Sequence, residues 1–310
     1  ALADATISGL ASVHGCIGAV DPVATFGNEE QKSRFLPKLA SGERLSAFAL
    51  TEPNAGSDLA NVTTRARLEG DEWVIDGQKV WTSGAHDADV ILTFVRTDPD
   101  VPKHKGISVI LVPTESAGLV RRPFPTVCHH DDLDFNEVFF TDVRVPAENL
   151  VGPLNGGWRV ANGALGHERT MMWMQYADRL HNLVEDFRPV TPLERDSYAS
   201  LVMDHQALRL LGSAAVAKAA RGEEDMTTIS VLKVLGSEAE RDATEAALES
   251  MGVEGLRHPA NTSAYAPYDL DYLSASWIER YFRSFAGTIA GGTSEIQRNI
   301  IARGLGMPLR

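Results

Sequence analysis

The chain has 310 residues, and 29 lysines and arginines against 42 aspartates and glutamates give it a formal charge of −13 at pH 7. Such an acidic chain repels nucleic-acid backbones and anionic lipid surfaces, so neither is an expected partner. Its hydrophobic fraction of 44% argues against a disordered protein, and no apolar run approaches the ~20 residues of a membrane helix. With only Cys16 and Cys128 for disulfides and no secretory pattern in the first residues, the sequence predicts a cytoplasmic enzyme.

The predicted elements change type twice along the chain. Residues 1–44 are predicted to be helical, with a short amphipathic helix over 29–36 that Pro37 is expected to end. Residues 45–152 carry strand patterns, including a hairpin of 73–75 and 78–81 about the turn Asp76-Gly77. Further strands are predicted over 46–50, 90–95, 107–112 and 138–145.

Residues 153–310 are helical again, with long helices expected over 157–176, 196–221, 225–251 and 277–305. This order predicts an α+β protein of three domains rather than a doubly wound sheet. The domains are a partial N-terminal helical domain (1–44), a middle antiparallel β-barrel-like domain (45–152) and a C-terminal helical bundle (153–310).

A carboxylate interrupts an apolar stripe on the helix predicted over 157–176. The stripe recurs at spacings of three and four residues and consists of Trp158, Ala161, Leu165, Glu168 and Met172. Burial would raise the pKa of Glu168 and make it a competent general base near neutral pH. A second apolar stripe on the same helix leaves two other readings open, in which another face is buried or Glu168 pairs with the adjacent Arg169.

Two loops have compositions that suit a ligand. Residues 51–58, Thr-Glu-Pro-Asn-Ala-Gly-Ser-Asp, offer backbone N–H groups and hydroxyls to an anionic or heteroaromatic ligand, or form an ordinary turn. Residues 291–295, Gly-Gly-Thr-Ser-Glu, run into a helix and could receive an anion at its N-terminus, or Thr293 or Ser294 could simply cap that helix. The run His129-His130-Asp131-Asp132 is interpreted as a solvated loop, and no metal site is predicted.

Five stretches taken together resemble the acyl-CoA dehydrogenase family of flavoproteins, and they occur in the family's order and spacing. They are FALTEPNAGSD (48–58), GDEWVIDGQKVWTSGA (70–85), FNEVFFTDVRVPAENLVG (135–152), NGGWRVANGALGHER (155–169) and AGGTSEIQRNIIARGLG (290–306). The resemblance implies an N-terminal helical domain, a middle β-domain and a C-terminal four-helix bundle. It also implies a tetramer in which FAD lies between the β-domain and the bundles of two subunits.

The resemblance assigns site residues by position. The residues expected to contact FAD are Phe48, Leu50, Thr51, Trp81, Thr82, Ser83, Arg195, Thr293 and Glu295. Those expected at the substrate are Ser57, Arg169 and Gly291. Many members carry their catalytic glutamate immediately before Gly-Thr, where this chain has Gly291. A second subgroup, resembling isovaleryl-CoA and long-chain acyl-CoA dehydrogenases, carries it before an arginine on the first bundle helix, which corresponds to Glu168.

The implied reaction is α,β-dehydrogenation of an acyl-CoA or acyl-carrier thioester to the trans-2-enoyl thioester, with an electron-transfer flavoprotein as acceptor. Glycine at position 291 leaves room beside the reacting carbons and predicts a branched or bulky acyl group, such as a sterol side chain or a polyketide-type acid.

Two departures from the family pattern support an alternative. The chain starts 50 residues before Thr51, so most of the N-terminal helical domain is expected to be missing. Glu249 and Val253 replace a glutamine and a glycine that approach the neighbouring FAD pyrophosphate. The alternative is a non-catalytic or half-site subunit of a heteromer, α2β2 instead of a homotetramer. A flavin-dependent oxygenase is a third reading, but Glu168 argues against it because oxygenation needs no α-proton base.

Overall fold

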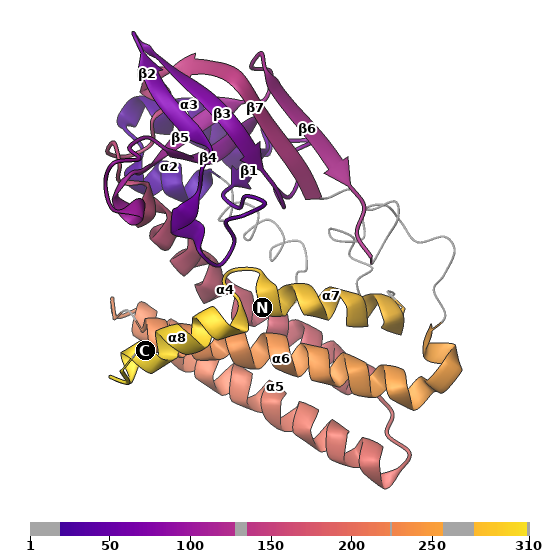
Figure 1. Cartoon of the computed structure of the whole chain (residues 1–310). Helices are drawn as coiled ribbons and strands as arrows, with labels where there is room; N and C mark the ends of the chain where they lie inside the picture. The colour runs from indigo at the N-terminus through magenta and orange to yellow at the C-terminus, as the bar shows by residue number, and fades with distance from the viewer. Residues whose placement is uncertain (1–18, 128–134, 224, 257–275, 309–310) are drawn as a thin grey trace. The chain divides into compact units, whose positions relative to one another are not determined.

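The structure, a computed structural model, describes residues 19–127, 135–223, 225–256 and 276–308, except the side chains of residues 165–171 (Figure 1). The chain forms two compact units. Of the described residues, 19–126 and 135–165 belong to the sheet unit, and 127, 166–223, 225–256 and 276–308 belong to the helical unit. The predicted α+β order, a β-domain followed by helices, is confirmed.

In the part of the sheet unit that the structure describes, two helices precede the sheet. Helix α2 covers Val20–Phe26, and α3 covers Glu29–Ala40 after the capping residue Asn28. The prediction that Pro37 ends this helix is wrong, because Pro37 lies inside α3. A proline this close to the end removes one N–H donor, but its carbonyl still accepts from the N–H of Ser41 at 3.1 Å. The last turn is therefore retained.

Seven strands form one sheet in the order β1-β4-β2-β3-β7-β6, with β5 also paired to β4. They are β1 Ser46–Ala49, β2 Arg65–Glu69, β3 Glu72–Lys79, β4 Val90–Arg96, β5 Ile107–Pro113, β6 Leu119–Phe124 and β7 Phe135–Pro146. The pairings are antiparallel, as predicted, except that β4 runs parallel to β1 and briefly to β2. Short 3-10 turns cover Leu59–Asn61, Lys103–Lys105 and Ala147–Asn149.

The predicted hairpin at Asp76-Gly77 is wrong, because β3 runs straight through both residues. The pairing of β3 with β7 is irregular at Gly77, whose φ of 149° suits glycine. A Cβ at Gly77 would lie 2.6 Å from the Cα of Thr64, so any larger residue would collide with the backbone. The chain instead reverses at Gly70, with φ of 65°, between β2 and β3.

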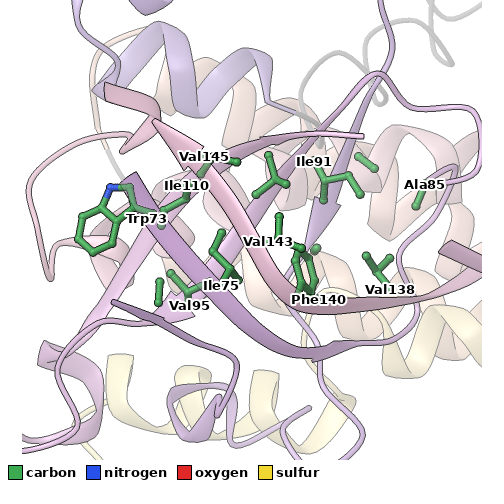
Figure 2. Close-up of a cluster of buried hydrophobic side chains, with 14 of the residues drawn as sticks. Trp73, Ile75, Ala85, Ile91, Val95, Ile110, Val138, Phe140, Val143 and Val145 are labelled. Atoms are coloured by element: carbon green, nitrogen blue, oxygen red, sulfur yellow. The ribbon is translucent and has the colours of Figure 1, made fainter. Parts of the chain in front are cut away.

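Strands β4 and β5 are buried on both faces, which explains their continuous apolar sequences. Along β4, Ile91 and Val95 join one hydrophobic core, whereas Leu92 and Phe94 join a second core that includes Val23 of α2. Figure 1 shows α2 and α3 against the sheet. Figure 2 shows the first core, with side chains from β3, β4, β5 and β7 pointing toward one another. Burial of each such side chain stabilises the fold by about 1.5–3 kcal/mol.

The helical unit contains most of α4 and all of α5 to α8. The bounds are α4 Gly157–Asp186, which begins in the sheet unit, α5 Pro192–Ala219, α6 Met226–Met251, α7 Trp277–Ile289 and α8 Ser294–Gly304, with a 3-10 turn at Gly252–Leu256. The single helix expected over 277–305 is two helices, because a turn at Gly291 and Gly292 separates α7 from α8. Among the described residues, no helix is long and apolar enough to cross a membrane.

Helix α6 contacts α5, α7 and α8 (Figure 1). Its buried residues form two stripes. The apolar stripe consists of Leu232, Gly236, Ala239, Ala243 and Ala247. The other is polar, recurs every three or four residues and consists of Ser230, Lys233, Ser237, Glu240 and Thr244. Glu240 pairs with Arg179 of α4 at 3.3 Å.

Candidate active site

Two of the segments predicted to contact the flavin lie side by side in the sheet unit. Thr51 follows β1, and Trp81 follows β3. The N–H of Val80 donates to the carbonyl of Thr51 at 2.9 Å, which joins the two segments directly. The structure therefore brings Thr51 next to the segment Trp81-Thr82-Ser83.

A buried ion pair reinforces this junction. The ammonium of Lys79, which is fully buried, donates to the Glu52 carboxylate at 2.8 Å and to the carbonyl of Leu50 at 3.2 Å. The same carboxylate accepts the N–H groups of Thr63 at 2.6 Å and Thr64 at 2.8 Å. Burial raises the pKa of Glu52, but the charge and donors around it outweigh burial and lower it to about 2. Burial lowers the pKa of Lys79 to about 8, against the attraction of Glu52.

Trp81 has an unusual backbone and an exposed ring. Its φ is 61°, a left-handed conformation that is costly for an aromatic residue and is found most often at functional sites. The indole packs edge-on against Phe124 and Phe135, with ring centroids 5.1 and 5.4 Å away. Even so, 56% of Trp81 is exposed. The surrounding aromatic rings therefore hold Trp81 in place and leave much of it available to a planar ligand.

Thr82 is fixed to the start of β7. Its N–H donates to the carbonyl of Asn136, and its carbonyl accepts both the backbone N–H and the side-chain amide of Asn136, all at 3.1 Å. The hydroxyl of Thr82 is buried, and in the described part of the chain it has no hydrogen-bond partner. Ser83, next in sequence, is exposed.

The other predicted site residues of the sheet unit are Phe48, Leu50 and Ser57, on β1 and in the loop after it. Phe48 and Leu50 are half-buried and pack on the core beneath β1. The ring of Phe48 lies 4.9 Å from that of Phe94. Ser57 is exposed in the loop after β1. The loop itself is tightened by two backbone hydrogen bonds between Glu52 and Ala55, at 3.1 and 3.2 Å.

In the helical unit, the glycine-rich turn leads directly into α8. Gly291 and Gly292 both have positive φ, 66° and 94°. Thr293 is the N-cap of α8, and its hydroxyl accepts the N–H of Ile296 at 3.3 Å, so the capping role considered for it is present. Glu295 is exposed in the first turn, where its own backbone N–H and then the Thr293 hydroxyl lower the pKa of its carboxyl.

Three predicted residues lie on other helices. Arg195 is exposed in the first turn of α5, one residue after the capping-box glutamate. Glu168 and Arg169 lie on α4, and their side chains are outside the described residues. The run 129–132 also lies outside them. In the described ranges, no group of three or more histidines, cysteines and acidic residues could hold a metal ion.

Sequence reasoning missed several residues that shape these segments. Glu52 and Lys79 lie inside stretches that carry the resemblance, but neither stretch shows that these two charges pair with each other. Asn136 and Gln297 are buried side chains that hydrogen-bond the backbone of predicted site residues. The position of Lys79 was a usable signal, because it faces inward in the alternating pattern of its strand and a buried lysine requires a partner.

The sheet unit fits a bound flavin. An exposed Trp81 and a buried, unpartnered Thr82 hydroxyl lie in consecutive positions, and Thr51 is hydrogen-bonded to the same segment. A heteroaromatic group placed there would cover the indole and offer hydrogen-bonding atoms to the hydroxyls and N–H groups around it.

Comparison with known proteins gives matches along the whole chain. Three family models match: the acyl-CoA dehydrogenase N-terminal domain at residues 1–43, the middle domain at 47–143 and the C-terminal domain at 155–306. Acyl-CoA dehydrogenase IpdE1 of Mycobacterium tuberculosis is 37% identical over 91% of this chain and 72% of its own.

Solved structures are also similar to this chain. The steroid ACAD Tcur3481-Tcur3483 is 33% identical, with a TM-score of 0.82 over 96% of this chain and 77% of its own. The ChsE4-ChsE5 complex from Mycobacterium tuberculosis is 28% identical, with a TM-score of 0.80 over 99% and 81%. The chain belongs to the acyl-CoA dehydrogenase family of FAD-dependent oxidoreductases.

Proposed function

We propose that this chain dehydrogenates a thioester with a branched or bulky acyl group and uses Glu168 as the catalytic base. The observation that carries this proposal is the turn before α8. Gly291 has φ of 66°, a conformation that suits glycine, and it contributes no carboxylate beside the reacting carbons. The base must then come from another element, and Glu168 on α4 is the residue that the His-Glu-Arg motif indicates. Similarity to a structure described as a steroid ACAD supports the bulky acyl group.

The chemistry needs a base and a polarised carbonyl at the same time. The α-hydrogen of a thioester is weakly acidic, so a hydrogen bond to the carbonyl oxygen must stabilise the charge that develops as the proton leaves. Glu168 takes the α-proton, and the N–H of Gly291 donates to the carbonyl oxygen. FAD, when bound, supplies the acceptor for the hydride that leaves the β-carbon. The electron pair of the broken Cα–H bond becomes the new double bond of the enoyl thioester.

Nine residues are proposed to contact FAD, as the family resemblance assigns them. They are Phe48, Leu50, Thr51, Trp81, Thr82, Ser83, Arg195, Thr293 and Glu295. Ser57 and Arg169 are proposed to contact the thioester's carrier portion. Support comes from the hydrogen bond between the Thr51 and Trp81 segments and from the unpartnered Thr82 hydroxyl.

The test is anaerobic bleaching of the bound flavin by a panel of acyl-CoA thioesters. The panel contains butanoyl-CoA, isovaleryl-CoA and the CoA thioester of a steroid with a carboxylated side chain. The wild type is expected to bleach faster with the branched or steroid thioester than with butanoyl-CoA. Glu168→Gln should slow bleaching by about 10²- to 10⁴-fold, the usual contribution of a general base. The matched control is Glu185→Gln, an exposed glutamate further along α4 that should bleach like the wild type.

Two results would reject the proposal. Turnover of butanoyl-CoA alone would reject the bulky acyl group. A Glu168→Gln variant as fast as Glu185→Gln would reject the assigned base.

A half-site role in a heteromer is the second candidate, and Val253 favours it. Val253 follows α6 and is 84% exposed, which is unusual for a valine. Its φ is not positive, so the backbone does not require the glycine that the family has there. Glu249, in the last turn of α6, is also exposed. A carboxylate and a branched side chain at this position would repel and crowd a diphosphate from a neighbouring subunit.

The assembly itself is proposed to be either a homotetramer or α2β2, with electrons passing to an electron-transfer flavoprotein. Met203 and Leu210, two turns apart on α5, are 64% and 70% exposed, as expected of a helix that packs against another subunit. The similarity to the ChsE4-ChsE5 complex supports the heteromer.

Flavin content separates the two assemblies. A homotetramer purified alone should carry about one FAD per chain. A half-site subunit should carry little FAD alone, and the double variant Glu249→Gln with Val253→Gly should then gain it. Full flavin content in the unaltered chain would reject the half-site role.

A further inference from the structure

The ammonium of Lys79 makes a second contact beside its ion pair with Glu52. Its Nζ also donates to the backbone carbonyl of Leu50, 3.2 Å away. Lys79 is fully buried, and the carboxylate of Glu52 is itself held by the N–H groups of Thr63 and Thr64. The anchored carboxylate therefore fixes the ammonium against the Leu50 carbonyl, and a charged donor binds a carbonyl more strongly than a neutral donor does.

The Leu50 carbonyl belongs to the same peptide unit as the N–H of Thr51. Among the described residues no peptide bond is cis, and a trans unit is planar, so this N–H points away from the carbonyl and from the ammonium bound to it. Hydrogen bonds in series polarise one another, so a charged donor on the carbonyl makes the N–H of the same unit a stronger donor. Lys79 therefore affects both the direction and the strength of the Thr51 N–H.

The peptide unit that follows Thr51 is held as well. Its carbonyl accepts the N–H of Val80 at 2.9 Å, and its N–H, which is that of Glu52, donates to the carbonyl of Ala55 at 3.2 Å. Thr51 itself is only half-buried. Because the units on both sides of Thr51 are held by hydrogen bonds, a ligand that binds its N–H does not have to order the backbone first.

We propose that Lys79 is a positioning residue of the flavin site, which directs and strengthens the Thr51 N–H as a donor to an acceptor atom of the flavin ring. This inference rests on the proposed contact between Thr51 and FAD. Lys79 is fully buried and acts only through the peptide unit, without touching the flavin. Reduction adds electron density to the acceptor atoms of the ring, so a stronger donor favours the reduced flavin over the oxidised flavin. Loss of the ammonium should therefore lower the reduction potential of bound FAD.

The test measures the two-electron midpoint potential of bound FAD by anaerobic reductive titration against a reference dye. Lys79→Met removes the ammonium and keeps the approximate length of the side chain. The variant should lower the affinity for reduced FAD, relative to that for oxidised FAD, about 10-fold. This change equals a fall of about 30 mV in the midpoint potential.

Two controls separate this effect from a loss of stability and from a loss of charge. Ile75→Ala truncates a fully buried side chain on the same strand, β3, in a hydrophobic core to which Leu50 does not belong. Lys103→Met removes a surface cation that pairs with Asp58 at 2.6 Å. Both controls should keep the potential of the wild type. A potential of Lys79→Met equal to that of either control would overturn the inference.

A second variant covers the case in which Lys79→Met does not fold. In Lys79→Gln the side-chain amide still offers a donor to the buried carboxylate of Glu52, but it is neutral and shorter than the lysine side chain. Its midpoint potential should lie below that of the wild type and of both controls. The potential of the wild type in Lys79→Gln would overturn the inference.

The titration needs no thioester, so its result is independent of the proposed reaction. A wild type that binds FAD but is not bleached by any panel thioester would reject the proposed dehydrogenation and leave the comparison of potentials valid. Normal bleaching of the wild type together with unchanged potentials in both Lys79 variants would overturn the inference alone. A wild type that takes up no FAD would overturn both.

Discussion

Replacing Lys79 with methionine would leave the carboxylate of Glu52 buried without its cation. The Glu52 side chain is 4% exposed and would keep only the neutral donors of Thr63 and Thr64. Removing one partner of a buried ion pair typically costs about 3–5 kcal/mol. The lowering of the Glu52 pKa from 4.5 to about 2 gives a similar figure, about 3 kcal/mol at about 1.36 kcal/mol per pKa unit. We expect Lys79→Met to lower the unfolding free energy of the sheet unit by about 3 kcal/mol at pH 7.

The effect should depend on pH in a defined direction. Because the folded-state pKa of Glu52 is lowered, the pair stabilises the protein fully from pH 4.5 up to the range near 8 in which Lys79 loses its proton, and this stabilisation is lost as the pH falls from 4.5 toward 2. In Lys79→Met the cation that lowers this pKa is absent. The difference in unfolding free energy between wild type and variant should therefore shrink as the pH falls through this range.

The unfolding free energy must be measured within the sheet unit itself, because a chain with two compact units does not unfold as a single two-state system. Hydrogen exchange of peptides covering residues 60–80, measured at increasing urea, gives the unfolding free energy of this region. Lys103→Met is the control, because Lys103 pairs with Asp58 at 2.6 Å on the surface and should contribute about 0–1 kcal/mol. A loss no larger in Lys79→Met than in Lys103→Met, or a difference that is constant between pH 4.5 and 3, would refute the reasoning.

Three further substitutions test the packing and the pH dependence. Gly212→Ala should lower the thermal midpoint by the equivalent of about 1–3 kcal/mol although alanine favours helices, because its Cβ would collide with the ring of Trp173. An unchanged midpoint would contradict this close contact. Gly77→Ala should lower the urea midpoint of the sheet unit, since its Cβ would lie 2.6 Å from the Cα of Thr64. A variant as stable as the wild type would show that β3 does not approach Thr64 this closely at residue 77. Burial, and then two neighbouring basic side chains, lower the pKa of His205, so stability should be complete above pH 6.5 and fall below it. His205→Gln should flatten the fall of the thermal midpoint below pH 6.5. The same slope of midpoint against pH in the variant and the wild type would show that His205 does not cause this fall.

Much of the fold can be predicted from local sequence, and the predictions that were wrong have physical causes. The apolar runs of β4 and β5 identify those strands because burial on both faces excludes polar residues from them. The turn preference of Asp76-Gly77 misleads, because pairing of β3 with β7 across the sheet outweighs a local preference. Pro37 misleads in the same way, since the cost of one lost hydrogen bond near a helix end is small compared with the burial of the helix.

The candidate site is less accessible to sequence reasoning. Thr51 and Trp81 are identified by resemblance, but their adjacency is seen only in the hydrogen bond between Val80 and Thr51, which joins segments that follow different strands. The burial of Glu52 with Lys79 likewise exists only after the sheet has formed. Spacing and composition describe one element at a time, and these contacts join several.

The polar stripe on α6 has a consequence for the helices around it. A helix that buries only methyl groups can slide along its neighbours by one turn, about 5.4 Å, and still bury methyl groups. Helix α6 cannot, because such a shift would carry buried groups such as Lys233 and Glu240 away from their surroundings and leave charges against apolar atoms. The stripe therefore sets the register of the bundle, as polar core positions do in coiled coils. The lengthwise position of α8, and of the glycine turn that precedes it, is then specified by polar side chains buried on α6.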